Sequence, residues 1–309
     1  MSETESETAP ARVLCLGLAV QDYVFSLPEM PTTAEKFRAS DMAVTGGGGA
    51  ANAAVAVARL GGGALLATRL GADRIAEAIV ADLEAEGVDC SHSVRYEGCT
   101  SSISAVLVDG AGERMVVNYR DAALPESVDW LPDPAGLSLG AVSVDNRWPI
   151  GAAHLLGLAR AAGLPGVLDG EAPMDSCGAA MLAASHVAFS RQGLTDWAGT
   201  DDIAAGLTAA AKQRNGGFVC VTDGADGVHF RHGATQGHVP AFRVRVVDTL
   251  GAGDVWHGAF ALSLAEGHTA TDAIRFASAV AALKCTEFGG RRGIPGRAQV
   301  ETFLREHSS

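Results

Sequence analysis

The chain has 309 residues, of which 48% are hydrophobic, and it carries a net charge of -13 at pH 7. This length can bury a sizeable core within one large domain, whereas the negative charge argues against nucleic acids and acidic membrane surfaces as partners. No apolar run reaches about 18 residues without charges, so the sequence predicts no membrane-spanning helix, and no signal-peptide pattern opens it.

The six cysteines are scattered along the chain, without a C-x-x-C pair or a metal-ligand spacing. Several lie in apolar, strand-like runs, so we expect buried free thiols in a reducing compartment, the cytoplasm. Residues 1–10 are polar and acidic, which predicts a disordered tail. Neither a repeat nor a linker divides the rest, so residues 11–309 are expected to form one domain.

The first elements predict a core strand followed by a flap. Residues 12–20 have the pattern of a buried strand, and Asp22 follows at its end, where it could accept hydrogen bonds from a sugar or cap a turn. Residues 23–45 alternate apolar and polar side chains, which is typical of exposed strands. The segments 101–108 and 114–119 predict a hairpin. Together these segments predict a small sheet that can cover a site.

Four consecutive glycines, Gly46–Gly49, precede a helical run of small residues that ends at Gly61. Glycines let a ligand approach the backbone. Positions 46 to 51 also fit G-x-G-x-x-A, and Asp73 follows at the distance expected of a dinucleotide-binding fold. That fingerprint should follow the first strand directly, near Gly17, so a Rossmann dehydrogenase is a minor alternative. A P-loop sequence is absent.

The second half alternates strands and helices, which predicts a parallel sheet with ligands at the carboxyl ends of its strands. Residues 222–227 form a glycine-rich turn at such an end, either a nucleotide wall or an ordinary hairpin turn. Strands are expected near 64–69, 141–145, 165–169, 186–190 and 217–222, and helices near 76–86, 255–266, 270–286 and 297–306.

One stretch combines two carboxylates with a flexible backbone: Asp248 and Asp254 flank Gly251-Ala252-Gly253, and an apolar helix follows. The backbone N–H groups of such a turn can approach an anion, and the helix dipole favours the same charge. Asp254 would then be a base beside an anion hole, as phosphoryl transfer to a hydroxyl requires. The alternative is a helix start with Asp in its first turn.

These two glycine-rich segments, in this order, resemble the two signatures of the PfkB, or ribokinase-like, family of carbohydrate kinases. The first is Gly47-Gly48 with Asn52 and Leu60-Gly61, and the second is Asp248–Asp254. The resemblance covers residues 12 to about 305. It implies an α/β protein with a three-layer α/β/α fold, a mostly parallel central sheet and a small β-sheet lid built from residues about 22–45 and 97–121.

The resemblance also implies a function, ATP-dependent phosphorylation of a sugar at a primary hydroxyl. Asp254 would deprotonate that hydroxyl, and Gly251, Ala252 and Gly253 would form the anion hole. The sugar would contact Asp22, Gly47, Gly48 and Asn52, and ATP would contact Thr222, Asp223, Gly224, Gly227, Ser278 and Ala282. Mg²⁺ would accompany ATP, a monovalent cation is a further candidate cofactor, and a homodimer through the lid is expected.

One departure from the family concerns the metal. Members often carry N-x-x-E on the turn before the nucleotide loop, where it serves the magnesium–phosphate network. This chain has Ser190-Arg191-Gln192-Gly193 there. Mg²⁺ would therefore depend on other groups, such as waters held by Asp169, Glu171 or Asp223.

Within the family, the chain most resembles kinases of 6-deoxy-6-sulfofructose, a ketohexose analogue with a sulfonate. The resembling stretches are 35–36, 117–119, 145–148, 255–258, 281–286 and 289–295. A sulfonate is always ionised, and Arg matches its oxygens with a planar fork. Lys36, Asn118 and Arg147 would surround the sulfonate, and His257 would contact a sugar oxygen. Two alternatives remain. The substrate could be a neutral ketohexose, as in a fructokinase or ketohexokinase, or the protein could be a non-catalytic sugar-binding protein on the same fold.

Overall fold

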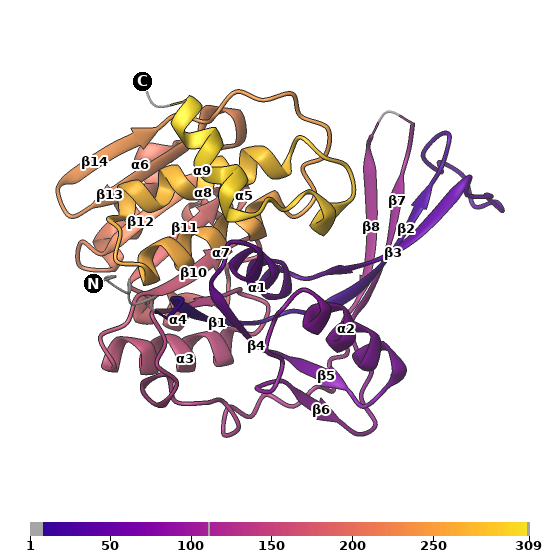
Figure 1. The fold of residues 1–309 in the computed structure, drawn as a ribbon, viewed down its shortest axis with the longest axis horizontal. Helices are drawn as coiled ribbons and strands as arrows, with labels where there is room; N and C mark the ends of the chain where they lie inside the picture. The colour runs from indigo at the N-terminus through magenta and orange to yellow at the C-terminus, as the bar shows by residue number, and fades with distance from the viewer. Residues whose placement is uncertain (1–8, 111, 308–309) are drawn as a thin grey trace, which may run out of the picture.

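The computed structural model describes residues 9–110 and 112–307, so most of the predicted tail lies outside the described residues. Its centre is an eight-stranded sheet in the order β14-β13-β12-β11-β10-β9-β1-β4 (Figure 1). The strands from β4 to β12 in this order are parallel, whereas β13 and β14 are antiparallel. The strands are β1 (Arg12–Leu16), β4 (Gly63–Ala67), β9 (Ala141–Val144), β10 (Gly166–Gly170), β11 (His186–Ser190), β12 (Phe218–Thr222), β13 (Val228–His232) and β14 (Thr235–Val239).

Helices cover both faces of this sheet, which confirms the three-layer α/β/α fold. On β1, Val13 and Cys15 pack into one helix layer, while Leu14 and Leu16 pack into the other. Burial on both faces explains why the parallel strands are apolar without alternation. One layer contains α1 (Gly49–Arg59), α2 (Arg74–Ala85), α7 (Ala252–Ala265), α8 (Ala270–Lys284) and α9 (Arg297–Glu306), and the other contains α3 (Pro149–Ala161), α4 (Gly178–Ala183), α5 (Arg191–Ala198) and α6 (Ile203–Gln213).

Two predicted strands are shorter than expected. The first core strand ends at Leu16 rather than Val20, because Gly17 has φ +147° and its α-carbon lies against the Asp145 carboxylate. The chain then enters β2 (Val20–Ser26) in another sheet. Likewise β4 ends at Ala67, and β5 (Arg69–Gly71) pairs with β6 (Val94–Tyr96) in a separate two-stranded sheet. The prediction also missed β13 and β14, whose outward side chains are largely polar.

The segments predicted to form a flap make a second sheet of four strands that projects from the core (Figure 1). We call this sheet the lid. It contains β2, β3 (Asp41–Gly47), β7 (Ile103–Val108) and β8 (Arg114–Tyr119), in the order β3-β2-β7-β8. The hairpin of β7 and β8 confirms the predicted pairing.

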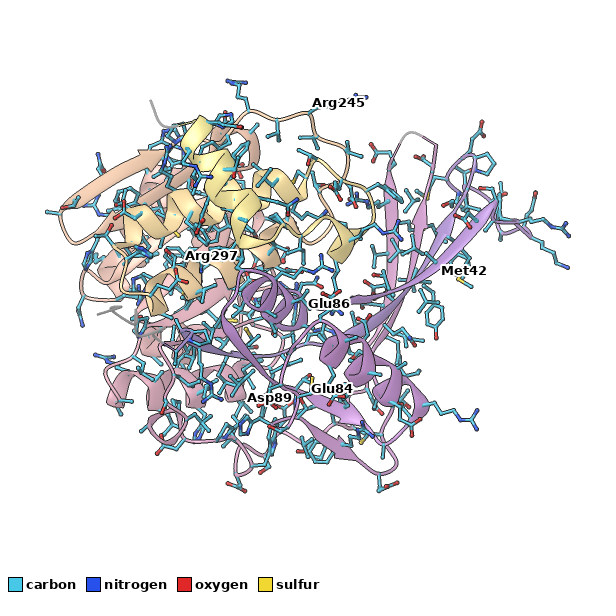
Figure 2. All side chains as sticks on the ribbon, viewed as in Figure 1. Met42, Glu84, Glu86, Asp89, Arg245 and Arg297 are labelled. Carbon is cyan, nitrogen blue, oxygen red and sulfur yellow. The ribbon has the colours of Figure 1, made fainter. Side chains whose placement is uncertain are left out.

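The two faces of the lid differ in character. Asp22, Ser104 and Asn118 pair across neighbouring strands and therefore share one face, which lies towards the core. The opposite face is apolar, and Figure 2 shows one of its members, Met42, at the periphery of the molecule. The exposed apolar side chains of this outer face are Met42, Val44, Met115, Val117 and Tyr119.

The glycine-rich segment lies between a lid strand and a core helix. It follows β3 rather than β1, and Asp73 accepts a hydrogen bond from Ala76 N (2.8 Å) as the N-cap of α2. This context differs from that of a dinucleotide-binding fold. None of the described helices has the length and apolarity needed to cross a bilayer.

Small residues bring α1 and α7 close together. A β-carbon at Gly258 of α7 would lie 2.3 Å from the carbonyl oxygen of Ala53 in α1. The next residue towards the start of α1 is Asn52, and Asp254 lies one turn before Gly258. The close contact therefore places these two polar side chains opposite each other.

Candidate active site

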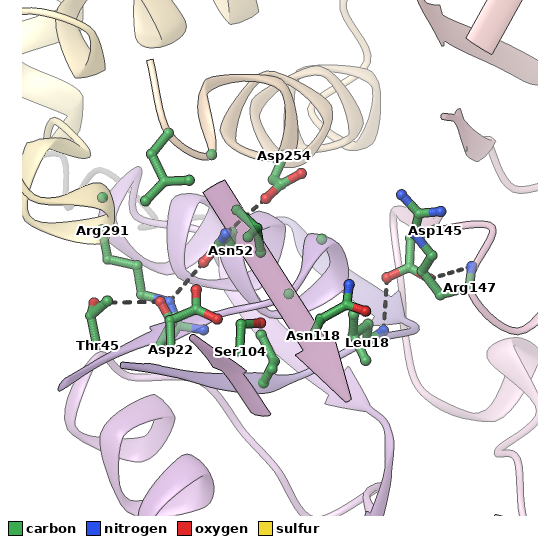
Figure 3. Close-up of a pocket in the computed structure, with 18 of the residues that line it drawn as sticks. Leu18, Asp22, Thr45, Asn52, Ser104, Asn118, Asp145, Arg147, Asp254 and Arg291 are labelled. Atoms are coloured by element: carbon green, nitrogen blue, oxygen red, sulfur yellow. Dashed lines mark hydrogen bonds between the residues drawn. The ribbon is translucent and has the colours of Figure 1, made fainter. Parts of the chain in front are cut away.

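A cavity of about 390 Å³ lies between the inner face of the lid and the carboxyl ends of the core strands (Figure 3). We call it the sugar cavity, after the ligand that the sequence analysis predicts for its lining residues. It brings together segments from both ends of the chain, as expected for an open α/β sheet with a lid. The predicted residues that line it are Asp22, Gly48, Asn52, Asn118, Arg147, Gly251 and Asp254.

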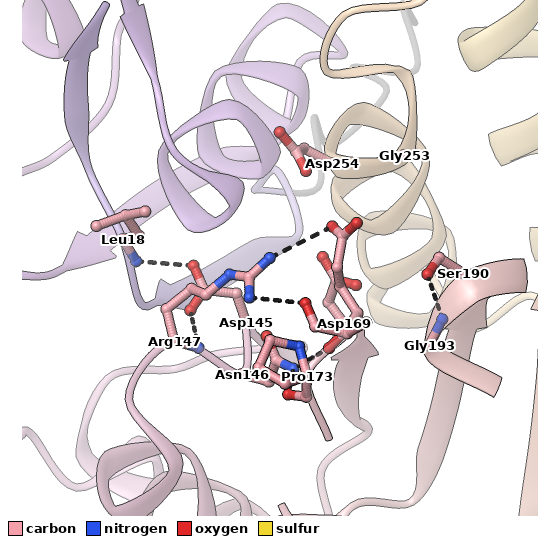
Figure 4. A network of polar contacts seen from close by, with 12 residues as sticks. Leu18, Asp145, Asn146, Arg147, Asp169, Pro173, Ser190, Gly193, Gly253 and Asp254 are labelled. Atoms are coloured by element: carbon pink, nitrogen blue, oxygen red, sulfur yellow. Dashed lines mark hydrogen bonds and ion pairs between the residues drawn. The ribbon is translucent and has the colours of Figure 1, made fainter. Parts of the chain in front are cut away.

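Asp254 lies in the first turn of α7 and faces the sugar cavity (Figures 3 and 4). Its Oδ2 accepts a hydrogen bond of 2.7 Å from Nδ2 of Asn52. Burial raises the pKa of Asp254, and the Asn52 hydrogen bond opposes this by stabilising the carboxylate. A carboxylate with a raised pKa is a stronger base than a solvated one.

The turn before α7 presents free backbone donors. Gly251 is the N-cap with φ +73°, a conformation that favours glycine. Ala252, a predicted member of the anion hole, donates its N–H to Thr249 O (3.2 Å) in this structure. The N–H groups of Gly251, Gly253 and Asp254 find no acceptor among the residues that the structure describes. Those three groups, at the positive end of a 14-residue helix, are suited to an anion.

A second cavity, of about 290 Å³, lies on the other side of the same turn. We call it the nucleotide cavity, because the sequence analysis predicts that residues of its wall contact ATP. Ala252 and Gly253 line it, whereas Gly251 and Asp254 line the sugar cavity, so the anion hole separates the two spaces. Its wall contains the predicted Thr222, Gly224, Gly227, Ser278 and Ala282.

Asp223 is not among the lining residues of the nucleotide cavity. Its carboxylate forms an ion pair with Arg191 (2.9 Å). The turn that contains Asp223 joins β12 to β13, so it is a hairpin turn as well as a cavity wall. The hairpin-turn interpretation is thus confirmed, and the role of the turn as a nucleotide wall stays a prediction.

His257 does not contact the sugar cavity, so its predicted role is wrong. It is 3% exposed, and its ring nitrogens lie 2.8 Å from Gly253 O and 3.1 Å from Ala188 O. Two carbonyl acceptors require an N–H on each nitrogen. Burial alone would lower the pKa of His257, but the Asp169 carboxylate, 3.5 Å away, and these carbonyls raise it. These contacts anchor α7, which contains His257, to β11.

Lys36 is the predicted sulfonate contact from the first lid segment. It lies in the exposed loop between β2 and β3, outside the lining of the sugar cavity. Gly47 likewise does not line the cavity but turns its carbonyl towards Arg291 (3.1 Å). The cationic residues that do line the sugar cavity are Arg120, Arg147 and Arg291.

Arg147 lies where the carboxyl end of β9 meets the lid (Figure 4). Its backbone N donates to Asp145 (3.0 Å), and its guanidinium donates to Ala172 O (3.0 Å). The Glu171 carboxylate lies 3.8 Å away. Asn118 lies in β8 and Arg120 follows it directly, and the Arg120 side chain has no hydrogen-bond or ion-pair partner among the residues that the structure describes. Sequence analysis missed Arg120, although it comes directly after the β8 segment that was quoted.

Three carboxylates meet at the inner end of the sugar cavity. Oxygen atoms of Asp169, Glu171 and Asp254 lie within 4.8 Å of one another. Burial raises the pKa of Asp169 to about 7, and the other two carboxylates add to this effect while His257 opposes it. Carboxylate oxygens are the ligands that Mg²⁺ prefers, so this donor set fits a divalent cation.

Asp248, the first carboxylate of the motif, is structural. It accepts hydrogen bonds from Leu250 N (2.8 Å) and from the amides of residues 289 and 290, and it pairs with Arg114 of the lid. Lys284 is 0% exposed, and its Nζ lies 2.9 Å from Asp248 O and 3.6 Å from Oδ2. Burial would raise the pKa of Asp248, but these donors lower it to about 2. The turn of the anion hole is thus tied to α8 and to the lid.

Comparisons with known proteins agree with this geometry. A family model described as pfkB family carbohydrate kinase matches residues 10–297. The chain is 28% identical over 309 residues to a ribokinase of Bacillus subtilis (strain 168), covering 95% of this chain and 99% of that protein. It is 28% identical over 286 residues to fructokinase-1 of Zea mays, covering 84% and 88%.

Solved structures give the same result. A provisionally assigned ribokinase from Agrobacterium tumefaciens has a TM-score of 0.92 and 36% identity, covering 97% of this chain and 99% of that one. A fructokinase with bound ATP from Xylella fastidiosa has a TM-score of 0.81 and 26% identity, covering 96% and 99%. The chain belongs to the pfkB family of carbohydrate kinases and is an ATP-dependent phosphotransferase that acts on an alcohol group.

Proposed function

We propose that the enzyme phosphorylates the primary hydroxyl of a ketohexose that carries an anionic group at its far end, with 6-deoxy-6-sulfofructose as the substrate. The observation that carries this proposal is the composition of the sugar cavity. Its reacting end holds Asp254 and the anion hole, and Asn118, Arg120 and Arg147 line it as well. A guanidinium fork matches the oxygens of a sulfonate.

In this mechanism, Asp22 and Asn52 hold the sugar with its hydroxyl beside Asp254. Asp254 takes the hydroxyl proton as the oxygen attacks the γ-phosphorus of ATP, and ADP leaves from the nucleotide cavity. The free N–H groups of Gly251 and Gly253 stabilise the charge on the transferring group. The lid excludes water, which would otherwise compete as the acceptor.

Mg²⁺ is part of this proposal, with Asp169 and Glu171 as the residues that would hold it through water molecules. When bound, Mg²⁺ neutralises charge on the phosphate oxygens. A monovalent cation stays a candidate cofactor; the ammonium of Lys284 already provides one buried positive charge behind the anion hole. The six free cysteines support the further proposal that the enzyme works in the cytoplasm.

We expect Arg147→Ala to weaken the use of sulfofructose by about 10–100-fold in kcat/KM, because a charged hydrogen bond is lost. The loss with fructose should be much smaller, since fructose has no charge to pair. The measurement is kcat/KM for both sugars in a coupled assay of ADP release. Arg95→Ala, which removes an exposed arginine outside the cavity, is the matched control. Equal losses with both sugars would mean that Arg147 is only structural.

The second candidate is a kinase of a neutral ketohexose. The fructokinases among the relatives support it, and so does the placement of Lys36 outside the cavity. A screen of fructose, sulfofructose, fructose 6-phosphate, tagatose and ribose by ADP release separates the two. Preference for fructose over sulfofructose would replace the proposed substrate, and no turnover with any sugar would favour a non-catalytic sugar-binding protein.

We also propose a homodimer through the lid, supported by the apolar outer face described above. Val117 lies on that face and is 63% exposed. We expect Val117→Lys to convert a dimer into a monomer, because charge is costly in an apolar interface. Light scattering after size-exclusion chromatography measures the mass. Ile150→Lys, an exposed apolar residue on α3, is the control. A wild-type monomer would contradict the proposal.

A further inference from the structure

We propose that the ammonium of Lys284 is a built-in monovalent cation for the anion hole: it occupies the place where a bound K⁺ would otherwise act, so turnover needs no added monovalent cation. This inference rests on the proposed role of residues 251–254 as the anion hole. Lys284 lines neither cavity. It is therefore a positioning residue, and sequence analysis gave it no role.

Lys284 lies behind the wall that the two cavities share. It is the last residue of α8, and its ammonium contacts Asp248, the first residue of the motif. The two residues after Asp248 reach both spaces, because Thr249 lines the nucleotide cavity and Leu250 lines the sugar cavity. Gly251 then begins the anion hole. The ammonium thus holds the chain directly before the free amides.

The oxygen atoms of Asp248 hold the ammonium. Lys284 is 0% exposed, and its Nζ donates to the main-chain oxygen of Asp248 (2.9 Å) and lies 3.6 Å from Oδ2. The carboxylate also accepts hydrogen bonds from Leu250 N (2.8 Å), Gly289 N (3.0 Å) and Gly290 N (3.1 Å). One ammonium therefore fixes both the main chain and the side chain of the residue that anchors the turn.

The charges behind the turn do not cancel. Asp248 has two cationic partners, Lys284 and Arg114 of the lid, so one positive charge is in excess. The pKa of Asp248 is lowered to about 2. It is thus a carboxylate at neutral pH, and a carboxylate favours the charged form of a neighbouring amine. A buried positive charge behind the turn strengthens its attraction for an anion in front.

The atoms that hold the ammonium are of the kind that K⁺ prefers. K⁺ exchanges its hydration shell for carbonyl and other oxygen atoms, and Asp248 presents a carbonyl and a carboxylate to Lys284. An ammonium has donors only, so it uses the same oxygens. A free K⁺ at this place would meet a like charge in a space that solvent does not reach, which is costly. The side chain therefore takes the place of the ion.

The first arm of the test uses the wild-type enzyme. We expect the same kcat and the same melting temperature in KCl, NaCl and choline chloride at equal ionic strength, with ATP and sugar free of K⁺. A K⁺ ion that binds the folded protein would raise the melting temperature by mass action, so this readout is independent of activity. A specific requirement for K⁺ in kcat, or a specific stabilisation by K⁺, would overturn the inference.

The second arm restores the missing cation to Lys284→Ala. The substitution removes three methylene groups and the nitrogen, which is the fragment that n-propylammonium supplies. We expect kcat to fall by about 10–100-fold, the size of a lost hydrogen bond to a charged group. Both n-propylammonium and K⁺ should restore kcat and raise the melting temperature, whereas n-propanol, which fills the same space without charge, should not.

The outcomes of the second arm separate charge from packing. Equal rescue by n-propanol, or no rescue by either cation, would overturn the inference. If Lys284→Ala does not unfold cooperatively, Lys284→Met fills the space without the charge and should show the same loss of kcat, with a much smaller change in the KM of the sugar. Lys212→Ala, which removes an exposed lysine on α6, is the matched control and should respond to neither cation.

The failure of this inference is distinguishable from the failure of the proposed function. Each arm uses the sugar that the wild type turns over best, so the identity of that sugar does not affect the result. Wild-type kcat in a folded Lys284→Met variant overturns this inference alone, provided that Asp254→Asn is inactive. If no sugar is turned over, the proposed function fails, and the melting temperatures still test the cation site.

Discussion

We expect Asp254→Asn to lower kcat by about 10²–10⁴-fold, the usual contribution of a general base. Asn keeps the shape of the side chain but cannot take the hydroxyl proton. Sugar affinity should change little, because the sugar contacts from the lid and from Asn52 remain. The measurement is kcat by ADP release, together with sugar binding by calorimetry. Asp175→Asn, an exposed aspartate outside both cavities, is the control.

Turnover close to the wild type in Asp254→Asn would contradict the role of Asp254 as the base. A variant that has lost sugar binding as well as turnover would point instead to a binding role. The wild-type profile adds an independent check: because burial raises the pKa of Asp254, activity should fall on the acidic side above the pH at which a solvated aspartate titrates.

The largest expected effect on stability comes from Lys284→Met, which should lower the free energy of unfolding by about 3 kcal/mol. The substitution removes a buried ammonium and leaves Asp248 with one cation fewer in an almost solvent-free place. Unfolding in urea measures the change. Lys212→Met, which replaces an exposed lysine on α6, should change stability little.

The pH dependence of this loss has a definite sign. The pKa of Asp248 is lowered to about 2 in the folded protein, so its stabilising pairs are present above the ordinary pKa of about 3.9 and are lost as the pH falls through the folded value. The deficit of Lys284→Met should therefore be full at neutral pH and should shrink below about pH 4. A deficit that does not change with pH would mean lost packing rather than a lost charge pair.

The structural features that could be predicted from the sequence depend on short, local sequence patterns. The parallel strands are apolar on both faces, and Gly48 and Gly251 have positive φ values, which favour glycine. The placement of Asp254 beside free amides follows from a helix that begins at Ala252. These features need only short stretches of chain, so they could be recognised without coordinates.

The predicted site residues that lie outside the sugar cavity, and the one that was missed, depend on contacts that the local sequence does not specify. Asp254 and His257 are one turn apart, so helical spacing suggests a shared face. The imidazole of His257 instead lies in the core, where Nε2 is 3.1 Å from the carbonyl oxygen of Ala188. Lys36 is on a lid segment, but its loop lies beyond the cavity. Arg291 was missed because it pairs with Asn52 across 239 positions in the sequence, and a buried arginine contradicts the usual expectation of exposure.

Gly258 packs against Ala53 of α1 and lines neither of the two cavities, yet the packing requires a residue without a side chain at this position. Because a β-carbon there would collide with a main-chain carbonyl, even alanine would force two helices apart. Separating α1 from α7 would lengthen the hydrogen bond of 2.7 Å between Asn52 Nδ2 and Asp254 Oδ2. A single methyl group at position 258, about one helical turn from Asp254, would therefore disturb the residue that we propose as the base.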